Sequence, residues 1–363
     1  HRPPPMGAWV LINAGWYYNY AYVLFAWQAA AALAAGNSVI LKPSEQTSLS
    51  SLIMMEAFSD LPKGLVQCVT GSGKVGAQLV GHADTHGVAF TGSVAGGQAV
   101  ARACAESFKR VLIEASGNDP FIVMPSASLD VAPRGLAFAA FANCGQVCVS
   151  AERIYVHNAI HDEFVDRLVT LARSLRIGNG LGKVDMGPLA TRRDRERYED
   201  VLSRAVAQGA KVACGGGRPA AANTGWFVDA TVLTDCTPDM DILNQESFGP
   251  VAPICRVDSL DEALEHANRS RFGLGANIYT NDLKEAMRAV NEFECGMVWV
   301  NAPLLDNEAV AFGGRKMSGT GRELGIEGLE QFRHTKMVMM DPNSEAQDFW
   351  WFPYKDEEAC PVS

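Results

Sequence analysis

The chain has 363 residues, of which 48% are hydrophobic and 20% charged, a globular composition that is too long for one hydrophobic core. Its net charge of -10 and the lack of a basic cluster exclude nucleic acid as a partner, because a protein that binds phosphates needs a positive field. The nine cysteines have no paired spacing, which favours a reducing compartment and argues against structural disulfides. We therefore expect a cytoplasmic protein, and an organellar targeting segment before His1 would be missing from the sequence.

A long uncharged stretch runs from Pro3 to Leu41 and is almost wholly apolar from Tyr20 to Ala35. It fits either a membrane span or a βαβ unit whose strands are buried on both faces. Two glycine turns interrupt it, and so do the polar residues Asn13, Asn19, Gln28 and Asn37. We therefore expect the buried βαβ unit and no contact with a membrane.

The first third of the chain alternates short apolar runs with helix-like stretches such as the one from Ser44 to Ser59. The predicted strands are Trp9 to Asn13, Ser38 to Leu41, Leu65 to Thr70, Val88 to Phe90 and Val111 to Ile113. This alternation predicts an α/β fold with a parallel sheet covered by helices, and nucleotide sites lie at the carboxyl ends of such strands.

A second α/β unit is predicted to begin near Gly117 and to end near Gly321. It contains an amphipathic helix from Asp162 to Leu175 and a glycine turn at Gly215-Gly216-Gly217. The predicted organisation is a cofactor domain over residues 1–116, a catalytic domain over 117–321 and a C-terminal segment over 322–363.

Two residues have the chemistry of a covalent catalyst. Cys148 follows the turn Asn143-Cys144-Gly145-Gln146, and Glu114 closes the apolar run Val111-Leu112-Ile113. A thiol that attacks a carbonyl and a carboxylate that activates water are the groups needed to form and then release an acyl intermediate.

Other motifs occur in order between Met6 and Pro342. They are Ala34-Ala35-Gly36-Asn37, Lys42-Pro43-Ser44-Glu45, Phe90-Thr91-Gly92-Ser93 with Gly97, Glu246-Ser247-Phe248-Gly249-Pro250, Phe312-Gly313-Gly314, and Ser318-Gly319-Thr320-Gly321-Arg322-Glu323. Together with the cysteine motif, they resemble the aldehyde dehydrogenase superfamily. The resemblance implies a Rossmann-like cofactor domain, incomplete because family members carry a long segment before the position of His1, and an α/β catalytic domain with an oligomerisation extension.

The resemblance implies a role for each catalytic residue. Cys148 is the nucleophile that forms a thiohemiacetal and then a thioester. Asn19 and the backbone N–H of Cys148 form the oxyanion hole, and Glu114 is the general base for the hydrolytic water. The implied reaction is oxidation of an aldehyde to a carboxylic acid.

The chain departs from the family pattern at three places. Tyr17-Tyr18 replaces Pro-Trp before Asn19, and Cys144 stands where Gln is common. We interpret Cys144 as a small buried thiol rather than a second nucleophile. Ala115-Ser116 replaces Leu-Gly, so the Ser116 side chain is expected to restrict Glu114 or to crowd the nicotinamide.

The resemblance also implies NAD as the cofactor. Lys42 and Glu45 match the positions that bind the adenosine ribose, and a carboxylate there repels a 2'-phosphate, so NAD is favoured over NADP. The glycine turn at Gly92 matches the pyrophosphate site at a helix N-terminus. The implied cofactor-binding residues are Lys42, Ser44, Glu45, Gly92, Ser93, Gly97, Glu246 and Phe248.

An aldehyde channel is implied by matched positions. Its residues are Tyr20, Val23, Leu24, Trp27, Asp306 and Phe312. Aromatic walls with an acidic rim suit an amino or quaternary ammonium aldehyde, while aromatic and aliphatic aldehydes fit equally well.

Two further motifs are interpreted as structural. Gly71-Ser72-Gly73-Lys74-Val75 lacks the spacing of a phosphate loop, and a hairpin-like turn is expected there. His157 and His161 lack the glutamate of a zinc protease, so no metal site is expected.

The partners expected are a small-molecule aldehyde and further copies of the chain, in a homodimer or homotetramer. The segment Lys336 to Met340 is expected to pair across subunits, and the aromatic tail Phe349 to Tyr354 to pack on a neighbouring subunit or on the catalytic domain. Two other functions stay open, an acylating dehydrogenase that transfers the thioester to coenzyme A and a catalytically silent or structural relative.

Overall fold

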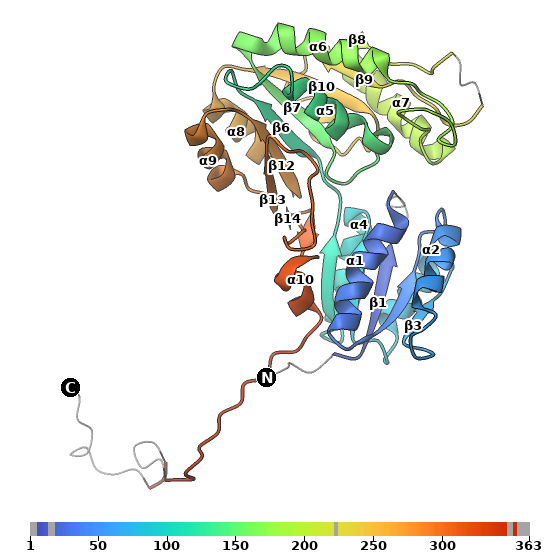
Figure 1. Cartoon of the computed structure of the whole chain (residues 1–363), viewed down its shortest axis with the longest axis vertical. Helices are drawn as coiled ribbons and strands as arrows, with labels where there is room; N and C mark the ends of the chain where they lie inside the picture. The colour runs from blue at the N-terminus through green and yellow to red at the C-terminus, as the bar shows by residue number, and fades with distance from the viewer. Residues whose placement is uncertain (1–5, 14–18, 221–223, 347–350, 354–363) are drawn as a thin grey trace, which may run out of the picture.

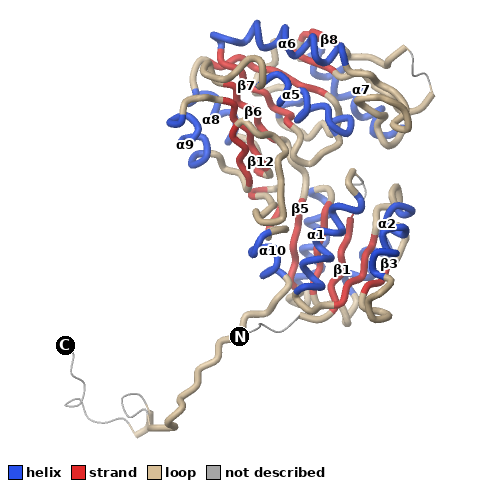
Figure 2. The backbone as a smooth tube through the Cα atoms, in the orientation of Figure 1, coloured by secondary structure: helices blue, strands red, loops and turns tan. Residues whose placement is uncertain are grey.

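The computed structural model of the chain describes residues 6–13, 19–220, 224–346 and 351–353, which form two units that each contain a β-sheet (Figure 1). A six-stranded sheet has the order β15-β5-β4-β1-β2-β3, and a seven-stranded sheet has the order β13-β12-β6-β7-β10-β9-β8. Helices flank both sheets (Figure 2). The α/β fold expected from the sequence is confirmed.

The first sheet is parallel except at one edge, where β15 is antiparallel to β5. Its strands are β1 (Ala8–Asn13), β2 (Ser38–Lys42), β3 (Val66–Cys68), β4 (Gly87–Thr91), β5 (Arg110–Glu114) and β15 (Gly319–Thr320). Its helices are α1 (Ala21–Ala34), α2 (Ser48–Met54), α3 (Gly73–Gly81) and α4 (Val94–Ala105). The five strands predicted from the apolar runs are all present.

The uncharged N-terminal stretch forms β1, α1 and β2, as predicted for a buried βαβ unit. Alternate residues of β1 face opposite sides of the sheet, so Trp9 and Leu11 pack with α1 while Val10 and Ile12 pack with α3 and α4. Burial on both faces explains why this strand is continuously apolar. Within the described residues, every helix is too short or too polar to span a lipid bilayer.

The predicted turn at Gly71-Ser72-Gly73 is wrong in type. β3 leads through this glycine-rich segment directly into α3, and the Ser72 hydroxyl accepts a hydrogen bond from the Lys74 N–H as the N-cap. Gly-Ser-Gly favours a helix start as well as a hairpin, because serine caps helices and glycine adopts either geometry. The apolar spacing of Val75, Leu79 and Val80 favours the helix.

The second sheet forms the core of the other unit. Its strands are β6 (Asp119–Val123), β7 (Ala151–His157), β8 (Lys211–Cys214), β9 (Thr231–Thr234), β10 (Val251–Val257), β12 (Gly275–Tyr279) and β13 (Met297–Val300). Its helices are α5 (Ala132–Phe141), α6 (His161–Ser174), α7 (Arg192–Ala207), α8 (Leu260–Asn268) and α9 (Leu283–Glu292). A small ladder pairs β11 (Phe272–Gly273) with β14 (Arg315–Lys316).

After β14 the chain returns to the first unit. β15 pairs with β5, and α10 (Gly325–Gln331) follows. Phe332 then packs on Trp9, with ring centroids 4.4 Å apart. The predicted boundaries at residues 116 and 321 stay a prediction, although residues 319–332 pack with the first sheet.

The described residues after Arg333 extend away from both units (Figures 1 and 2). Lys336 to Met340 forms no strand within this chain and is exposed, and Trp351 and Phe352 are exposed as well. The aromatic tail was expected to pack either on a neighbouring subunit or on the catalytic domain. Trp351 and Phe352 do not pack on the predicted catalytic domain of their own chain. Phe349, Trp350 and Tyr354 lie outside the described residues.

Candidate active site

Cys148 lies in the segment between α5 and β7, after a 3₁₀ turn at Ala142–Gly145. Asn143, Cys144 and Gly145 all have left-handed backbones, with φ of 50°, 59° and 68°. A β-carbon on Gly145 would lie 2.2 Å from the Gly249 carbonyl oxygen, so only glycine fits there. Glycine at position 145 is therefore a requirement of this turn.

Gln146 holds the turn in place. Its Nε2 donates to the Asn143 carbonyl at 3.1 Å, and its Oε1 accepts from the Ala190 N–H at 3.0 Å. The Asn143 side chain donates back to the Gln146 carbonyl at 3.1 Å. These three hydrogen bonds fix the backbone of the buried Gln146, two residues before Cys148.

Glu114 is the last residue of β5 and lies beside Cys148. Both its carboxylate oxygens are buried, and no group within the described residues donates a hydrogen bond to them. Burial raises the pKa of Glu114 well above its ordinary value, and the charge of Glu323 raises it further. A carboxyl with a raised pKa is suited to accept a proton near neutral pH.

Burial also raises the pKa of the Cys148 thiol well above its ordinary value, and the adjacent Glu114 adds to the shift. The sulfur is therefore a thiol at neutral pH in this arrangement, and its proton must move before it attacks. Burial raises the pKa of Cys144 to about 12, and the Cys144 side chain belongs to the core of the second unit. This burial agrees with the interpretation of Cys144 as a structural thiol.

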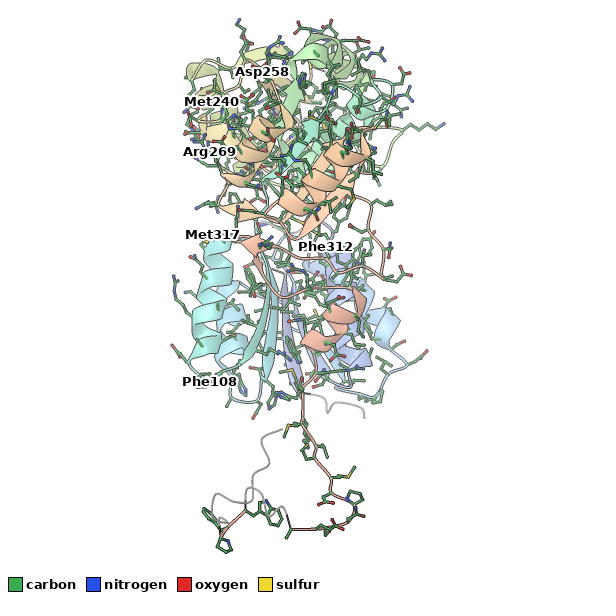
Figure 3. All side chains as sticks on the ribbon, turned by 90° about the vertical axis from the view of Figure 1, so that its left-hand side faces the viewer. Phe108, Met240, Asp258, Arg269, Phe312 and Met317 are labelled. Carbon is green, nitrogen blue, oxygen red and sulfur yellow. The ribbon has the colours of Figure 1, made fainter. Side chains whose placement is uncertain are left out.

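Cys148 lines a pocket of about 240 Å³ between the two units. The pocket gathers the predicted catalytic residue Asn19 and every predicted channel residue, namely Tyr20, Val23, Leu24, Trp27, Asp306 and Phe312. Trp27 and Phe312 face each other with ring centroids 5.3 Å apart, and Figure 3 places Phe312 between the units. The oxygen Oδ1 of Asn19 is buried without a hydrogen-bond partner in the described part of the chain.

Sequence reasoning missed four residues of the pocket wall, which are Phe138, Val147, Val149 and Leu304. Val147 and Val149 flank Cys148, so their position next to the nucleophile was a usable signal. Phe138 projects from α5 and Leu304 has a left-handed backbone with φ of 60°. Neither has a local motif that marks it as a pocket residue.

A second pocket, of about 260 Å³, lies between α3 and α4 at the carboxyl ends of β1, β2 and β4. Of the predicted cofactor residues, Lys42 and Ser93 line it. Lys42 is buried and forms an ion pair with Glu45 at 3.7 Å. Burial lowers the pKa of Lys42, and Glu45 partly offsets this shift. Ser44 is buried beside them.

The glycine turn brings α4 close to the sheet. The Gly92 N–H donates to the Glu114 carbonyl at 3.0 Å, and the Ser93 hydroxyl caps α4 by accepting from the Gly96 N–H at 3.2 Å. A β-carbon on Gly97 would lie 2.9 Å from Ile113 Cγ2. Gly97 thus acts by close packing, whereas Gly92 contributes a backbone hydrogen bond to the end of β5. Gly73 and Gly76 of α3 also line the pocket, and sequence reasoning missed both.

Glu246 and Phe248 lie in the loop before β10. The Gly117 N–H donates to Glu246 Oε1 at 3.2 Å, which places this carboxyl against the segment that follows Glu114. Phe248 is buried in one apolar cluster with Cys148, Trp299 and Phe312. The predicted cofactor residues thus divide into a group near Lys42 and a group near Cys148.

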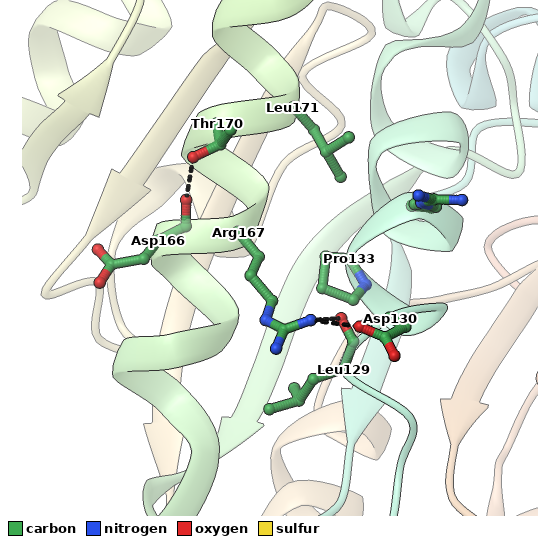
Figure 4. A pocket seen from close by; sticks show the side chains of 8 residues that line it. Leu129, Asp130, Pro133, Asp166, Arg167, Thr170 and Leu171 are labelled. Carbon is green, nitrogen blue, oxygen red and sulfur yellow. Dashed lines mark hydrogen bonds and ion pairs between the residues drawn. The ribbon is translucent and has the colours of Figure 1, made fainter.

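Another surface pocket, of about 320 Å³, lies between α5 and α6 and contains none of these residues (Figure 4). Its Arg167 donates to Asp130 Oδ1 at 2.6 Å and to Glu163 Oε1 at 2.6 Å. In the described part of the chain no cluster of three or more His, Cys, Asp or Glu side chains is arranged to hold a metal ion. The eight cysteines described there are free.

The site thus combines a buried cysteine, a neighbouring carboxylate and a pocket, which are the groups that the sequence analysis predicts for a covalent catalyst. The family model "Aldehyde dehydrogenase family" matches residues 1–338, so the chain belongs to the aldehyde dehydrogenase family. The betaine aldehyde dehydrogenases of Brucella anthropi and Brucella melitensis are each 39% identical over 345 residues. The match covers 94% of this chain and 70% of each relative.

Solved structures of the family have the same fold. An aldehyde dehydrogenase from Bacillus cereus, in an NAD+ complex, is 38% identical with a TM-score of 0.88, covering 92% of this chain and 68% of that one. Betaine aldehyde dehydrogenase from Staphylococcus aureus with NAD+ is 32% identical with a TM-score of 0.90, covering 96% and 69%. Lactaldehyde dehydrogenase from Escherichia coli is 34% identical with a TM-score of 0.88, covering 92% and 70%.

Proposed function

We propose that the protein oxidises an aldehyde to a carboxylic acid with NAD, through a covalent intermediate on Cys148. The observation that carries this proposal is the single pocket lined by Cys148 and Asn19, with Glu114 against the thiol. The NAD+ complexes of the relatives from Bacillus cereus and Staphylococcus aureus support the cofactor.

The residues between α3 and α4 fit a dinucleotide. The pocket has apolar walls for a base, with Lys42 and the α4 N-terminus at its polar end, and a helix N-terminus favours a phosphate. Half-exposed Glu45 beside Lys42 is placed to accept hydrogen bonds from a ribose and to repel a 2'-phosphate, which favours NAD over NADP. Ser44, Gly92, Ser93 and Gly97 complete this end of the site.

In the first half-reaction, Glu114 takes the thiol proton and the Cys148 sulfur adds to the aldehyde carbon. The carbonyl oxygen gains the negative charge, and Asn19 with the Cys148 N–H stabilises it. NAD, when bound, would supply the hydride acceptor that lets this oxyanion collapse to a thioester, and Glu246 and Phe248 are proposed to hold its nicotinamide end.

In the second half-reaction, Glu114, having released the thiol proton to solvent, removes a proton from water, whose oxygen attacks the thioester carbon. The carbon–sulfur bond breaks, the acid leaves, and the proton that Glu114 took from water passes to the Cys148 sulfur and restores the thiol. Ser116 is buried next to this carboxylate, and its carbonyl accepts a hydrogen bond from the Ser318 hydroxyl at 2.7 Å. The segment after Glu114 is thus anchored, which supports a fixed position for the base.

The substrate is proposed to be an aldehyde that carries a cationic group. Tyr20, Trp27 and Phe312 supply aromatic walls, and Asp306 supplies a carboxylate to the same pocket. The Brucella relatives are betaine aldehyde dehydrogenases, which supports a quaternary ammonium aldehyde.

The test is NADH formation by the purified chain with betaine aldehyde, with and without coenzyme A. Acid as the product without coenzyme A supports the proposal. Formation of a coenzyme A thioester instead indicates an acylating dehydrogenase. Absence of NAD binding and of turnover indicates a silent relative.

The assembly is proposed to be a homodimer or homotetramer in the cytoplasm. The exposed apolar residues Met337 to Met340 support association through this segment, since exposed apolar surface of this kind marks an interface. The free cysteines support a reducing location. The domain boundaries at residues 116 and 321 are part of the same proposal.

A further inference from the structure

The loop Gln245 to Phe248 is fastened to the second sheet by one buried carboxylate, that of Glu152 on β7. Glu152 Oε1 accepts from the Phe248 N–H at 2.7 Å and from the Ser247 hydroxyl at 2.8 Å. Its Oε2 accepts from the Ser247 N–H at 2.9 Å and from Asn118 Nδ2 at 3.0 Å. A carboxylate at the start of the strand that follows Cys148 therefore binds the loop that contains Glu246 and Phe248.

All four partners of Glu152 are donors, which matches an ionised carboxylate because such a group only accepts. Each oxygen receives two hydrogen bonds, so among the described residues hydrogen bonds, and no arginine or lysine ion pair, compensate the buried carboxylate. Neighbouring Arg153 instead donates to the Asn118 carbonyl at 2.7 Å. This arrangement cannot be reproduced by a neutral amide, because an amide NH₂ would face donors.

The loop needs such a fastening. Phe248 has a left-handed backbone with φ of 46°, a conformation that bulky side chains adopt only when their surroundings impose it. Its N–H is one of the four donors to Glu152. The same backbone places the Phe248 ring in the apolar cluster that contains Cys148.

The opposite end of the loop is tied to the segment that follows Glu114. Asn118 Nδ2 donates both to Glu152 and to the Gln245 carbonyl, the latter at 3.2 Å. One residue earlier, the Gly117 N–H donates to Glu246 Oε1 at 3.2 Å. Glu152 and Asn118 thus fix both sides of Glu246.

We propose that Glu152 is a positioning residue for the nicotinamide end of the cofactor. It acts by holding the loop that presents Glu246 and Phe248 toward Cys148, and it has no contact with the adenosine pocket near Lys42. This inference rests on the proposed binding of NAD. It predicts that loss of the Glu152 carboxylate weakens binding of the nicotinamide end of NAD and leaves binding of the adenosine end unchanged.

The experiment compares NAD with AMP, which has only the adenosine end. In the full chain, Glu152→Gln is expected to raise the NAD dissociation constant relative to that of AMP by roughly 10-fold, because it leaves buried donors unpaired. The AMP dissociation constant is expected to stay within about 2-fold of the wild-type value, because Glu152 has no contact with the adenosine pocket near Lys42. A general loss of stability would weaken both ligands together.

The matched control is Thr280→Val. It breaks another hydrogen-bond cluster, in which the buried Thr280 bonds to Ser126, Glu285 and the Asp282 N–H just after β12. The NAD-to-AMP ratio is expected not to change in this variant. If Glu152→Gln fails to fold, Ser247→Ala decides the question, because it removes a single donor and should raise the same ratio by a smaller factor.

Two results overturn the inference in distinguishable ways. Wild-type chain that binds neither NAD nor AMP removes the proposed cofactor and this role of Glu152 with it. Wild-type binding of NAD with an unchanged NAD-to-AMP ratio in both Glu152→Gln and Ser247→Ala leaves the proposed function standing and removes only the role of Glu152.

Discussion

A β-carbon added to Gly117 would lie 2.0 Å from the backbone oxygen of Cys148. The segment that follows Glu114 therefore passes directly against the backbone of Cys148, at a distance that only glycine permits. This contact brings the end of β5 in the first unit to Cys148 in the second. It explains why a residue three positions after the proposed base constrains the thiol.

Replacing Gly117 by alanine is expected to displace Cys148. The turnover number should fall by on the order of 10²-fold, because misplacement of a reacting group by about 1 Å has this effect. The control is Gly187→Ala, since a β-carbon on Gly187 has no neighbour within 4 Å. Equal turnover numbers for the two variants would contradict the constraint.

Cys148→Ala is expected to lower aldehyde oxidation by on the order of 10³-fold or more, because the nucleophile is lost. NAD binding should be retained, since Lys42 and the α4 N-terminus lie elsewhere. Cys144→Ala is the matched control and should keep its activity. Steady-state NADH formation and NAD titration measure both effects, and turnover by the Cys148 variant would refute the assignment.

Glu114→Gln is expected to slow steady turnover more than the first burst of NADH. Deacylation requires the carboxylate, whereas in the first half-reaction bulk base can replace Glu114 as the acceptor of the thiol proton at higher pH. In the wild type, burial raises the pKa of Glu114, so deacylation should rise with pH through that raised pKa and lose this dependence in the variant. Rapid-mixing measurements across pH test this. A burst and a steady rate that fall by the same factor at every pH would indicate another role for Glu114.

Asp306→Asn is expected to raise KM for betaine aldehyde roughly 5-fold, the equivalent of about 1 kcal/mol for a partly exposed charge pair. The matched neutral substrate is 3,3-dimethylbutanal, whose KM should not change. Burial raises the pKa of Asp306 to about 6, so the wild-type preference for the cation should be present above this pH and lost as the pH falls below it. Equal effects on both aldehydes would exclude a charge role.

Association through the C-terminal segment predicts a shift in mass on charge insertion. Met339→Asp should move the protein toward the monomer in light scattering, because Met339 is exposed within an apolar run. Asn343→Asp adds the same charge nearby and should leave the mass unchanged. A wild-type monomer at high concentration would contradict the proposed assembly.

Much of the first sheet was predictable because each strand is a short apolar run that ends at a turn residue. The segment from Trp9 to Leu41 is the best example, since burial on both faces of a parallel sheet leaves a continuous apolar pattern. The glycine-rich start of α3 was mispredicted because Gly-Ser-Gly is compatible with two local structures. Only the helical spacing that follows distinguishes them.

The candidate site, like the first sheet, was predictable only in part. Cys148, Glu114 and the channel residues have local motifs, and the pocket contains the channel residues together with Cys148. The clamps formed by Gln146 and Glu152 were not predicted, because they join segments far apart in the chain. Gln28 is a similar case, since its Nε2 donates to Glu323 Oε1 at 2.5 Å across a separation of 295 residues. Residue spacing along the sequence does not predict such contacts between distant segments.

The return of the chain through β15 has a consequence for synthesis and for dissection of the protein. The first sheet has its edge strand, and the Trp9 side chain its partner Phe332, only after the whole second unit has been made. During synthesis, β5 is therefore an open edge of the sheet from the time the first 116 residues leave the ribosome until residues 319–332 have been made. Expressing the first unit without the rest of the chain would leave this edge open permanently. The first unit should therefore be produced together with a separate peptide that contains residues 319–332.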